Sequence, residues 1–233
     1  SRAERVFCIR TSDASLLRRT LPRYSYKIET IATRIDPVDL PDAKLRSKQP
    51  GPPKLIGIGS LIEVKRVDRF IDWLAALNST GVQYRAVWLG DGPLRSILAE
   101  RAEKSSVSIS WLGHVDAVTV AEELAHADLM LLTSEFEVLS LAALEAMAKS
   151  LPIVTTNFFG VHDFIIDQVT GIVLRDDIPP LKAAEVIADL LRNESLRSAM
   201  GKHARTLFED IFSGSERMAY AYSQHYKEIL EVS

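Results

Sequence analysis

From Lys54 onward, the sequence alternates between short apolar runs and amphipathic segments. The first run is "KLIGIGSL", and comparable runs recur at "YRAVWLG", "VSISWLG", "DLMLLTS", "LPIVTT" and "TGIVL". The segments between them carry apolar residues at helical spacing, as in "VDRFIDWLAALN". Continuous apolar strands separated by helices indicate a parallel sheet that is buried on both faces. We therefore predict an α/β fold, a doubly wound parallel sheet with helices on both faces.

Composition excludes several other classes of protein. Apolar residues make up 47% of the 233 residues and charged residues 25%, which suits a globular domain with a sizeable core. The net charge of −3 argues against a nucleic-acid partner. The single cysteine, Cys8, cannot form an internal disulfide, which favours a reducing compartment. No run of 18 apolar residues predicts a transmembrane helix, and the apolar run in "SRAERVFCIR" is too short for a secretory signal.

The chain divides into four parts. Residues 1–40 predict a strand, a helix beginning at Ser12–Asp13 and a second strand over "KIETIATRIDPVDL" that Pro37 ends. The chain begins close to a strand, which suggests a fragment of a longer protein. The four predicted parts are this unit (1–40), a linker rich in proline and charge (41–53), the α/β domain (54–212) and a final helix (213–233).

Ligands of a doubly wound sheet bind beyond the carboxyl ends of its strands, where the strand order reverses. In the first loop at that edge, Gly57 and Gly59 end a strand, and Lys65 and Arg66 precede a helix. Small residues and a cation at a helix N-terminus favour an anion site. A basic helix start that is merely exposed to solvent would have the same sequence pattern. The second loop, "GDGP" (90–93), is expected to be a tight structural turn.

Two later loops complete the predicted edge. In "WLGHVD", His114 could contact a ligand, although a lone histidine is more often exposed and Trp111 more often belongs to the core. In "SEFEVLSLAALEAM", Glu137 follows a strand and Glu145 lies within an apolar helix, eight residues later. Eight residues at 100° each would bring both carboxylates to one helical face. Burying Glu145 without a partner would be costly, so we expect one, and sugar hydroxyls are suitable.

Other chemistries lack their motifs. The histidines do not show metal-ligand spacing, no "GxSxG" nucleophile elbow occurs, and no "GK[ST]" phosphate loop is present.

Taken together, the motifs resemble the retaining nucleotide-sugar glycosyltransferases of family 4, which have the GT-B fold. The resemblance covers about residues 54–230 and includes, in order, "GIGSLIEVKRVD", "VWLGDGP", "ISWLGHV", "ADLMLLTSEFEVLSLAALEAMAKSLPIVTT", "VTGIVL" and "GKHAR". It implies that the α/β domain is the C-terminal, donor-binding half of such an enzyme. Residues 1–40 would then be a remnant of the N-terminal acceptor domain, on which the final helix would pack, leaving an exposed apolar patch there.

The resemblance also implies residue roles. Glu137 would contact the transferred sugar, and Lys65 would neutralise the diphosphate leaving group with the first-turn amides of the helix. Glu145 would hold the ribose hydroxyls, and the loop at Trp111 would border the nucleobase. The residues assigned to donor binding are Glu145, Gly59, Ser60, Arg66, Leu139, Ser140, Leu141, Trp111, Gly113 and His114.

Five positions depart from the family pattern. Ser60 stands where an arginine is usual, and Arg66 replaces the final glycine of the same loop. Val138 and Ser140 replace two glycines between the glutamates, and Phe159 replaces the first glycine of a Gly-Gly pair. These changes imply a rearranged phosphate grip, with Arg66 as the substitute cation, or weaker donor binding.

The resemblance implies transfer of a sugar from a nucleoside-diphosphate sugar with retention of configuration, without a cofactor or a metal. The partners would be this donor and a carbohydrate or lipid-linked acceptor bound by the half outside this chain. We expect a cytoplasmic protein that could meet the inner face of the membrane through that half. The alternatives are a nucleotide-sugar epimerase, a phosphorylase-like enzyme, or a degenerate GT-B module without catalysis.

Overall fold

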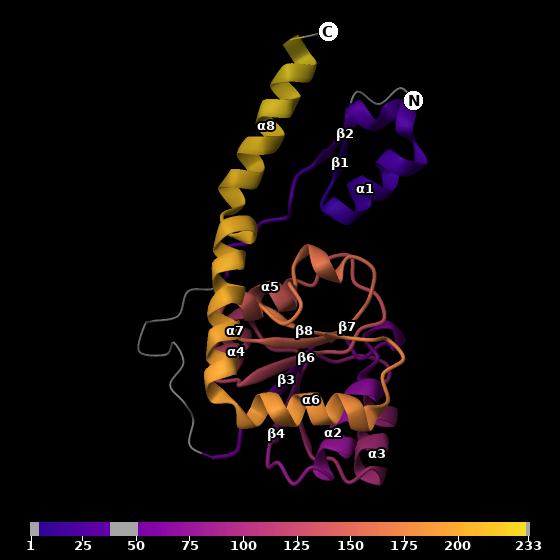
Figure 1. The fold of residues 1–233 in the computed structure, drawn as a ribbon, viewed down its shortest axis with the longest axis vertical. Coiled ribbons are helices and arrows are strands. Elements are labelled where there is room, and N and C mark those ends of the chain that lie inside the picture. The colour runs from indigo at the N-terminus through magenta and orange to yellow at the C-terminus, as the bar shows by residue number, and fades with distance from the viewer. Residues whose placement is uncertain (1–4, 38–50, 232–233) are drawn as a thin grey trace.

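A six-stranded parallel sheet forms the centre of the molecule in the computed structural model, which describes residues 5–37 and 51–231 (Figure 1). Every neighbouring pair is parallel, and the order β5-β4-β3-β6-β7-β8 reverses direction between β3 and β6. The predicted doubly wound sheet is therefore confirmed. Its strands are β3 (Lys54–Ile58), β4 (Arg85–Leu89), β5 (Ile109–Gly113), β6 (Leu129–Leu132), β7 (Ile153–Thr156) and β8 (Gly171–Leu174).

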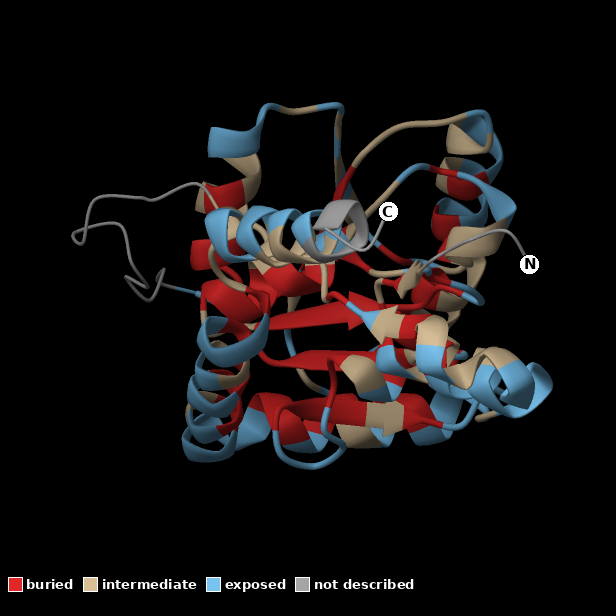
Figure 2. Cartoon of the chain, turned by 90° about the horizontal axis from the view of Figure 1, so that it is seen from above, coloured by how far each residue is buried: buried red, intermediate tan, exposed pale blue. Residues whose placement is uncertain are grey.

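Helices cover both faces of the sheet and bury two separate apolar clusters. One face carries α2 (Val67–Asn78), α3 (Arg95–Lys104) and α6 (Pro180–Arg192), and the other carries α4 (Ala117–Ala125) and α5 (Leu141–Ala148). The next helix, α7 (Glu194–Leu207), contributes Met200 to the first cluster and Ala204 to the second. Figure 2 shows the buried strands enclosed by helices with exposed outer faces.

The N-terminal unit is a small parallel pair of strands with a helix between them. It consists of β1 (Val6–Cys8), α1 (Thr11–Thr20), the 3₁₀ turn η1 (Pro22–Lys27) and β2 (Ile28–Thr30). The second strand is shorter than predicted, because among the described residues it pairs only with β1, which has three residues. Beyond it, Ile35 forms a single bridge with Ser213. Residues 38–40 and most of the predicted linker lie outside the described residues.

The chain ends in the π-helical turn η5 (Phe208–Phe212) and the long helix α8 (Ser215–Glu231). Helix α8 stands beside the N-terminal unit (Figure 1), where the ring of Phe7 meets that of Tyr222 edge-on, with 5.3 Å between centroids. Tyr220 and Tyr226 on the same helix are 67% and 57% exposed, so part of its aromatic surface is uncovered. Nowhere in 5–37 or 51–231 is a helix both long and apolar enough to span a bilayer.

The loops that leave β3 and β4 touch each other backbone to backbone. Gly90 has a φ of 122°, and a Cβ at this position would lie 2.2 Å from the carbonyl oxygen of Gly59. Glycine is therefore needed at Gly90 for its conformation and for space. This close approach fixes the spacing of two loops at the carboxyl edge of the sheet.

Replacing Gly90 with alanine tests this packing, with Gly81→Ala as the matched control. Gly81 has a φ of 72° but no neighbour within 4 Å, so its substitution adds only the left-handed strain, about 1–2 kcal/mol. We expect Gly90→Ala to lose about 1–3 kcal/mol more, because a backbone carbonyl must move. Urea unfolding measures both free energies, and equal losses would contradict the packing argument.

Candidate functional site

The loops that follow β3 and β6 meet at the point where the strand order reverses. The amide of Glu135 donates to the carbonyl of Val64 (2.9 Å), and the hydroxyl of Thr133 donates to the carbonyl of Lys65 (3.1 Å). These bonds join the two loops directly beyond the carboxyl ends of adjacent strands. In doubly wound sheets this is the position of the ligand crevice.

Lys65 and Glu137 form an ion pair across this junction. The Lys65 Nζ lies 2.6 Å from Oε1 of Glu137, and the hydroxyl of Ser134 donates to the same oxygen at 2.7 Å. The Glu137 side chain is only 9% exposed, so the cation and the hydroxyl offset the cost of burying its charge. The stem of Lys65 lies against Gly59, where a Cβ would be 3.2 Å from Cε. The structure thus brings Lys65, Glu137 and Gly59 together.

Ser60 and Arg66 lie at the two ends of the loop after β3. Ser60 is exposed, whereas Arg66 follows the 3₁₀ turn η3 (Glu63–Lys65) and caps α2 with a left-handed φ of 48°. The left-handed conformation favours glycine, the residue that Arg66 replaces in the family pattern. Its guanidinium pairs with Asp68 at 3.1 Å and lies 3.6 Å from Glu135. Arg66 is therefore held by carboxylates at the edge of the loop.

Helix α5 begins later than predicted, at Leu141. Ser140 is its N-cap, with a hydroxyl that accepts a bond from the amide of Ala143 at 3.3 Å. Glu137 therefore lies in the preceding loop, and the prediction that helical spacing places both glutamates on one face is wrong. The amides left free in the first turn are those of Leu141 and Ala142, whereas Leu139 and Ser140 precede this turn.

Glu145 is half-buried on α5 and faces α4. It lines a small pocket with Pro37, Ala117, Ala121, Leu124 and Lys149. Burial raises the pKa of the Glu145 carboxyl above its ordinary 4.5, and the nearby charge of Lys149 opposes that rise. Among the residues that the structure describes, none donates a hydrogen bond to this carboxylate. We expected a partner for Glu145, and the described residues include no hydrogen-bond donor that fills this role.

Two of the three residues predicted near the end of β5, Trp111 and Gly113, lie in the strand itself, and His114 follows it. The Trp111 ring packs against the core, and the guanidinium of Arg95 lies 5.5 Å from its centroid. Gly113 has a φ of 68° and accepts a bond from the amide of Gly90 at 2.8 Å. His114 is exposed, and its loop leads into Ala117, which lines the Glu145 pocket. Of these three residues, His114 is nearest in sequence to the Glu145 pocket.

Sequence reasoning missed two residues of this region. Ser134, which bonds Glu137, lies inside the quoted motif, and its position directly after the strand was the available signal. Arg10 comes from the N-terminal unit and is 6% exposed, yet it bonds the carbonyls of Glu137 and Phe159. Nothing in the sequence links residues so distant in the chain.

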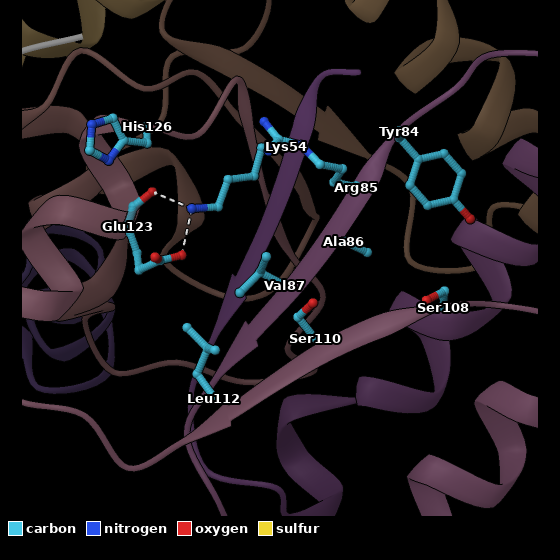
Figure 3. A pocket seen from close by; sticks show the side chains of 10 residues that line it. All are labelled: Lys54, Tyr84, Arg85, Ala86, Val87, Ser108, Ser110, Leu112, Glu123 and His126. Carbon is cyan, nitrogen blue, oxygen red and sulfur yellow. Dashed lines mark hydrogen bonds and ion pairs between the residues drawn. The ribbon is translucent and has the colours of Figure 1, made fainter. Parts of the chain in front are cut away.

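A larger groove lies elsewhere on the sheet. Its volume is about 510 Å³, and Figure 3 shows its lining, including the ion pair between Lys54 and Glu123. Lys54 and Arg85 open β3 and β4, so part of this lining lies at the opposite ends of the strands from the predicted site. In the part of the chain with described coordinates, no group of three or more His, Cys, Asp or Glu could hold a metal ion.

Comparison with known proteins identifies the family of this chain. The model of the family "Glycosyl transferases group 1" matches residues 42–207, more than half of the chain. The chain is 33% identical over 178 residues to the N-acetyl-alpha-D-glucosaminyl L-malate synthase of Bacillus anthracis. The aligned region covers 76% of this chain and 45% of that protein. It is 30% identical over 170 residues to the lipopolysaccharide glucosyltransferase WaaG of Escherichia coli, covering 71% and 45%.

Solved structures share the fold. A sucrose-phosphate synthase from Thermosynechococcus elongatus superposes with a TM-score of 0.80 at 21% identity, covering 99% of this chain and 59% of that one. An Anabaena protein, HepE, solved with UDP and glucose, gives a TM-score of 0.79 at 15% identity, covering 97% and 63%.

This chain belongs to the group 1 glycosyltransferases and has the parallel-sheet architecture of the GT-B glycosyltransferases. The family resemblance seen in the sequence is thereby confirmed. The chain spans less than half the length of the two curated relatives above.

Glu145→Gln should make the protein more stable at neutral pH. The pKa of Glu145 is higher in the folded state than its ordinary value of 4.5. The folded protein therefore loses stability as the pH rises from 4.5 through the folded-state pKa, and it stays less stable at higher pH. An amide does not ionise, so the variant should melt at a higher temperature than wild type at pH 7. The difference should close below pH 4.5.

Thermal melting across this pH range measures the effect, with Glu103→Gln, an exposed position on α3, as the control. A Glu145→Gln variant that melts below wild type at pH 7 would show that burial of the charge is not the dominant effect.

Proposed function

We propose that this chain forms the donor-binding half of a glycosyltransferase that uses a nucleoside-diphosphate sugar and retains the configuration of the transferred sugar. The observation that carries the proposal is the Lys65–Glu137 pair at the reversal point of the sheet. The first turn of α5 begins four residues after Glu137, and a helix N-terminus is a suitable place for an anion.

The diphosphate would lie between Lys65 and the amides of Leu141 and Ala142. A cation and a helix N-terminus stabilise the negative charge that grows on a departing diphosphate, and this role needs no protein nucleophile. The stem of Lys65 passes close to Gly59, and its ammonium is positioned by the ion pair with Glu137. Glu137, which now balances Lys65, would be left to contact the sugar as the phosphates take over that cation.

Glu145 would hold the ribose. Its half-buried carboxylate accepts no hydrogen bond from another described residue, and two adjacent hydroxyls suit such an acceptor. The exposed loop at His114 leads into the same pocket and would border the base. The acceptor would bind mainly to the half of the protein outside this chain.

Calorimetric titration tests donor binding. UDP is the first ligand to try, because a solved structure that shares the fold holds UDP, followed by GDP and ADP and the glucose conjugates of all three. We expect one nucleotide to bind, and Glu145→Gln to weaken it about 10- to 100-fold, since bonds to a charged acceptor contribute about 1.5–3 kcal/mol.

Lys65→Met should also weaken binding of the nucleoside diphosphate and leave binding of the corresponding nucleoside unchanged, because only the phosphates need the cation. Glu103→Gln is again the control. If none of the three nucleotides or their sugars binds, the proposal fails and the interaction-module alternative gains support.

Stereochemistry is tested with the full-length protein. Proton NMR of the first-formed product should show the same anomeric configuration as the donor, and chelation of divalent metals should not change the rate. An inverted product would contradict the proposal, and an epimerised donor formed without any acceptor would favour the epimerase alternative.

A further inference from the structure

Arg10 reaches from the N-terminal unit into the loops of the candidate site. Its Nη1 donates to the carbonyl of Glu137 at 2.9 Å and to that of Phe159 at 3.1 Å. Its Nε and Nη2 donate to the two carboxylate oxygens of Asp13 at 2.8 and 2.7 Å. The guanidinium also lies 5.2 Å from the centroid of the Phe159 ring. One side chain thus joins α1, the loop after β6 and the loop after β7.

The surroundings of Arg10 are shaped for it. Its side chain is 5% exposed, and a buried guanidinium is tolerated only when its donors are used. Gly160 has a φ of 87°, and a Cβ there would lie 2.4 Å from Nη1 of Arg10. Glycine at this position therefore provides both the left-handed turn and the space for the guanidinium. Asp13, in the first turn of α1, fixes the plane of the fork.

The contact acts on the residue that carries the sugar-facing carboxylate. Arg10 holds the main chain of Glu137, and no other described residue donates to that carbonyl. The carboxylate of the same residue pairs with Lys65 and Ser134. Glu137 is thus fixed at its backbone from the N-terminal unit and at its side chain from the donor domain.

We propose that Arg10 is a positioning residue of the donor site, which sets the place of the Glu137 carboxylate for the sugar of a nucleoside-diphosphate sugar. This inference rests on the proposed function. The N-terminal unit would then contribute to sugar binding as well as to the acceptor side. The nucleotide should be affected little, because in the described part of the chain neither Glu145 nor the first turn of α5 has a hydrogen bond or an ion pair with Arg10.

The test compares the affinities of one nucleoside diphosphate and of its sugar conjugate, taking the pair that binds wild type in the titrations above. We expect Arg10→Ala to lower the affinity for the sugar conjugate about tenfold relative to that for the nucleoside diphosphate. The affinity for the nucleoside diphosphate itself should change less than about twofold. Arg10→Lys should be intermediate, because an ammonium can bond a carbonyl but cannot keep the fork on Asp13.

Ser12→Ala is the matched control. The amide and the hydroxyl of Ser12 both donate to Asp163, so this variant weakens the same junction without touching Glu137. Both affinities should stay at their wild-type values. An effect of Ser12→Ala equal to that of Arg10→Ala would show that only general docking of the N-terminal unit matters, and would overturn the inference.

Two further outcomes separate this inference from the proposed function. If wild type binds neither ligand, the proposed function fails and the inference fails with it. If wild type binds both and Arg10→Ala leaves their ratio unchanged, only the inference is overturned. Should thermal melting show Arg10→Ala unfolded, Asp13→Asn decides: it keeps the guanidinium but loosens its fork, and an unchanged ratio there overturns the inference.

Discussion

Strands β3 and β6 pair in parallel at the centre of the sheet, and the helices that follow them pack on opposite faces. Their following loops therefore leave the sheet toward opposite faces, and a doubly wound sheet is expected to bind its ligand between such loops at the carboxyl edge. The hydrogen bonds from Thr133 and Glu135 keep the bases of these loops together. Every residue to which we assign contact with sugar or diphosphate depends on this one register, because a shift of either strand would separate Lys65 from Glu137.

Charge in the site is unevenly compensated. Lys65 and Glu137 neutralise each other at 2.6 Å, and Arg66 is shared between Asp68 and Glu135. Glu145 has only the more distant help of Lys149, and burial raises its pKa. A protein selected for stability alone would favour a neutral side chain there. The cost of keeping a carboxylate is the physical reason for assigning a ligand to Glu145 and a mainly organising role to the Arg66 cluster.

The sequence predicted the features that repeat along the chain and those that depend on neighbouring residues. Apolar runs identified the strands of the large sheet, and the order of motifs identified the family. The start of α5 was missed because "SEFEVLSLAALEAM" has no strong helix breaker, so only the bond between the Ser140 hydroxyl and the Ala143 amide shows where the helix begins. The direction of the Trp111 ring depends on the pleat of β5 and on Arg95. Arg10 depends on the docking of two distant segments, which no local pattern encodes.

The bridge between Ile35 and Ser213 places the end of the N-terminal unit beside the start of α8. The amide of Ile35 donates to the carbonyl of Phe212 at 2.8 Å, and Arg34 donates to that of Ser213 at 3.0 Å. The N-terminal unit therefore contacts the rest of the chain at this seam, at α8 through Phe7, and at the Arg10 junction. A rotation of this unit about the seam would displace the guanidinium of Arg10 by an amount that grows with its distance from the seam. Under the proposed role of Arg10, residues around Ser213 would therefore influence the position of Glu137, although they lie outside the candidate site.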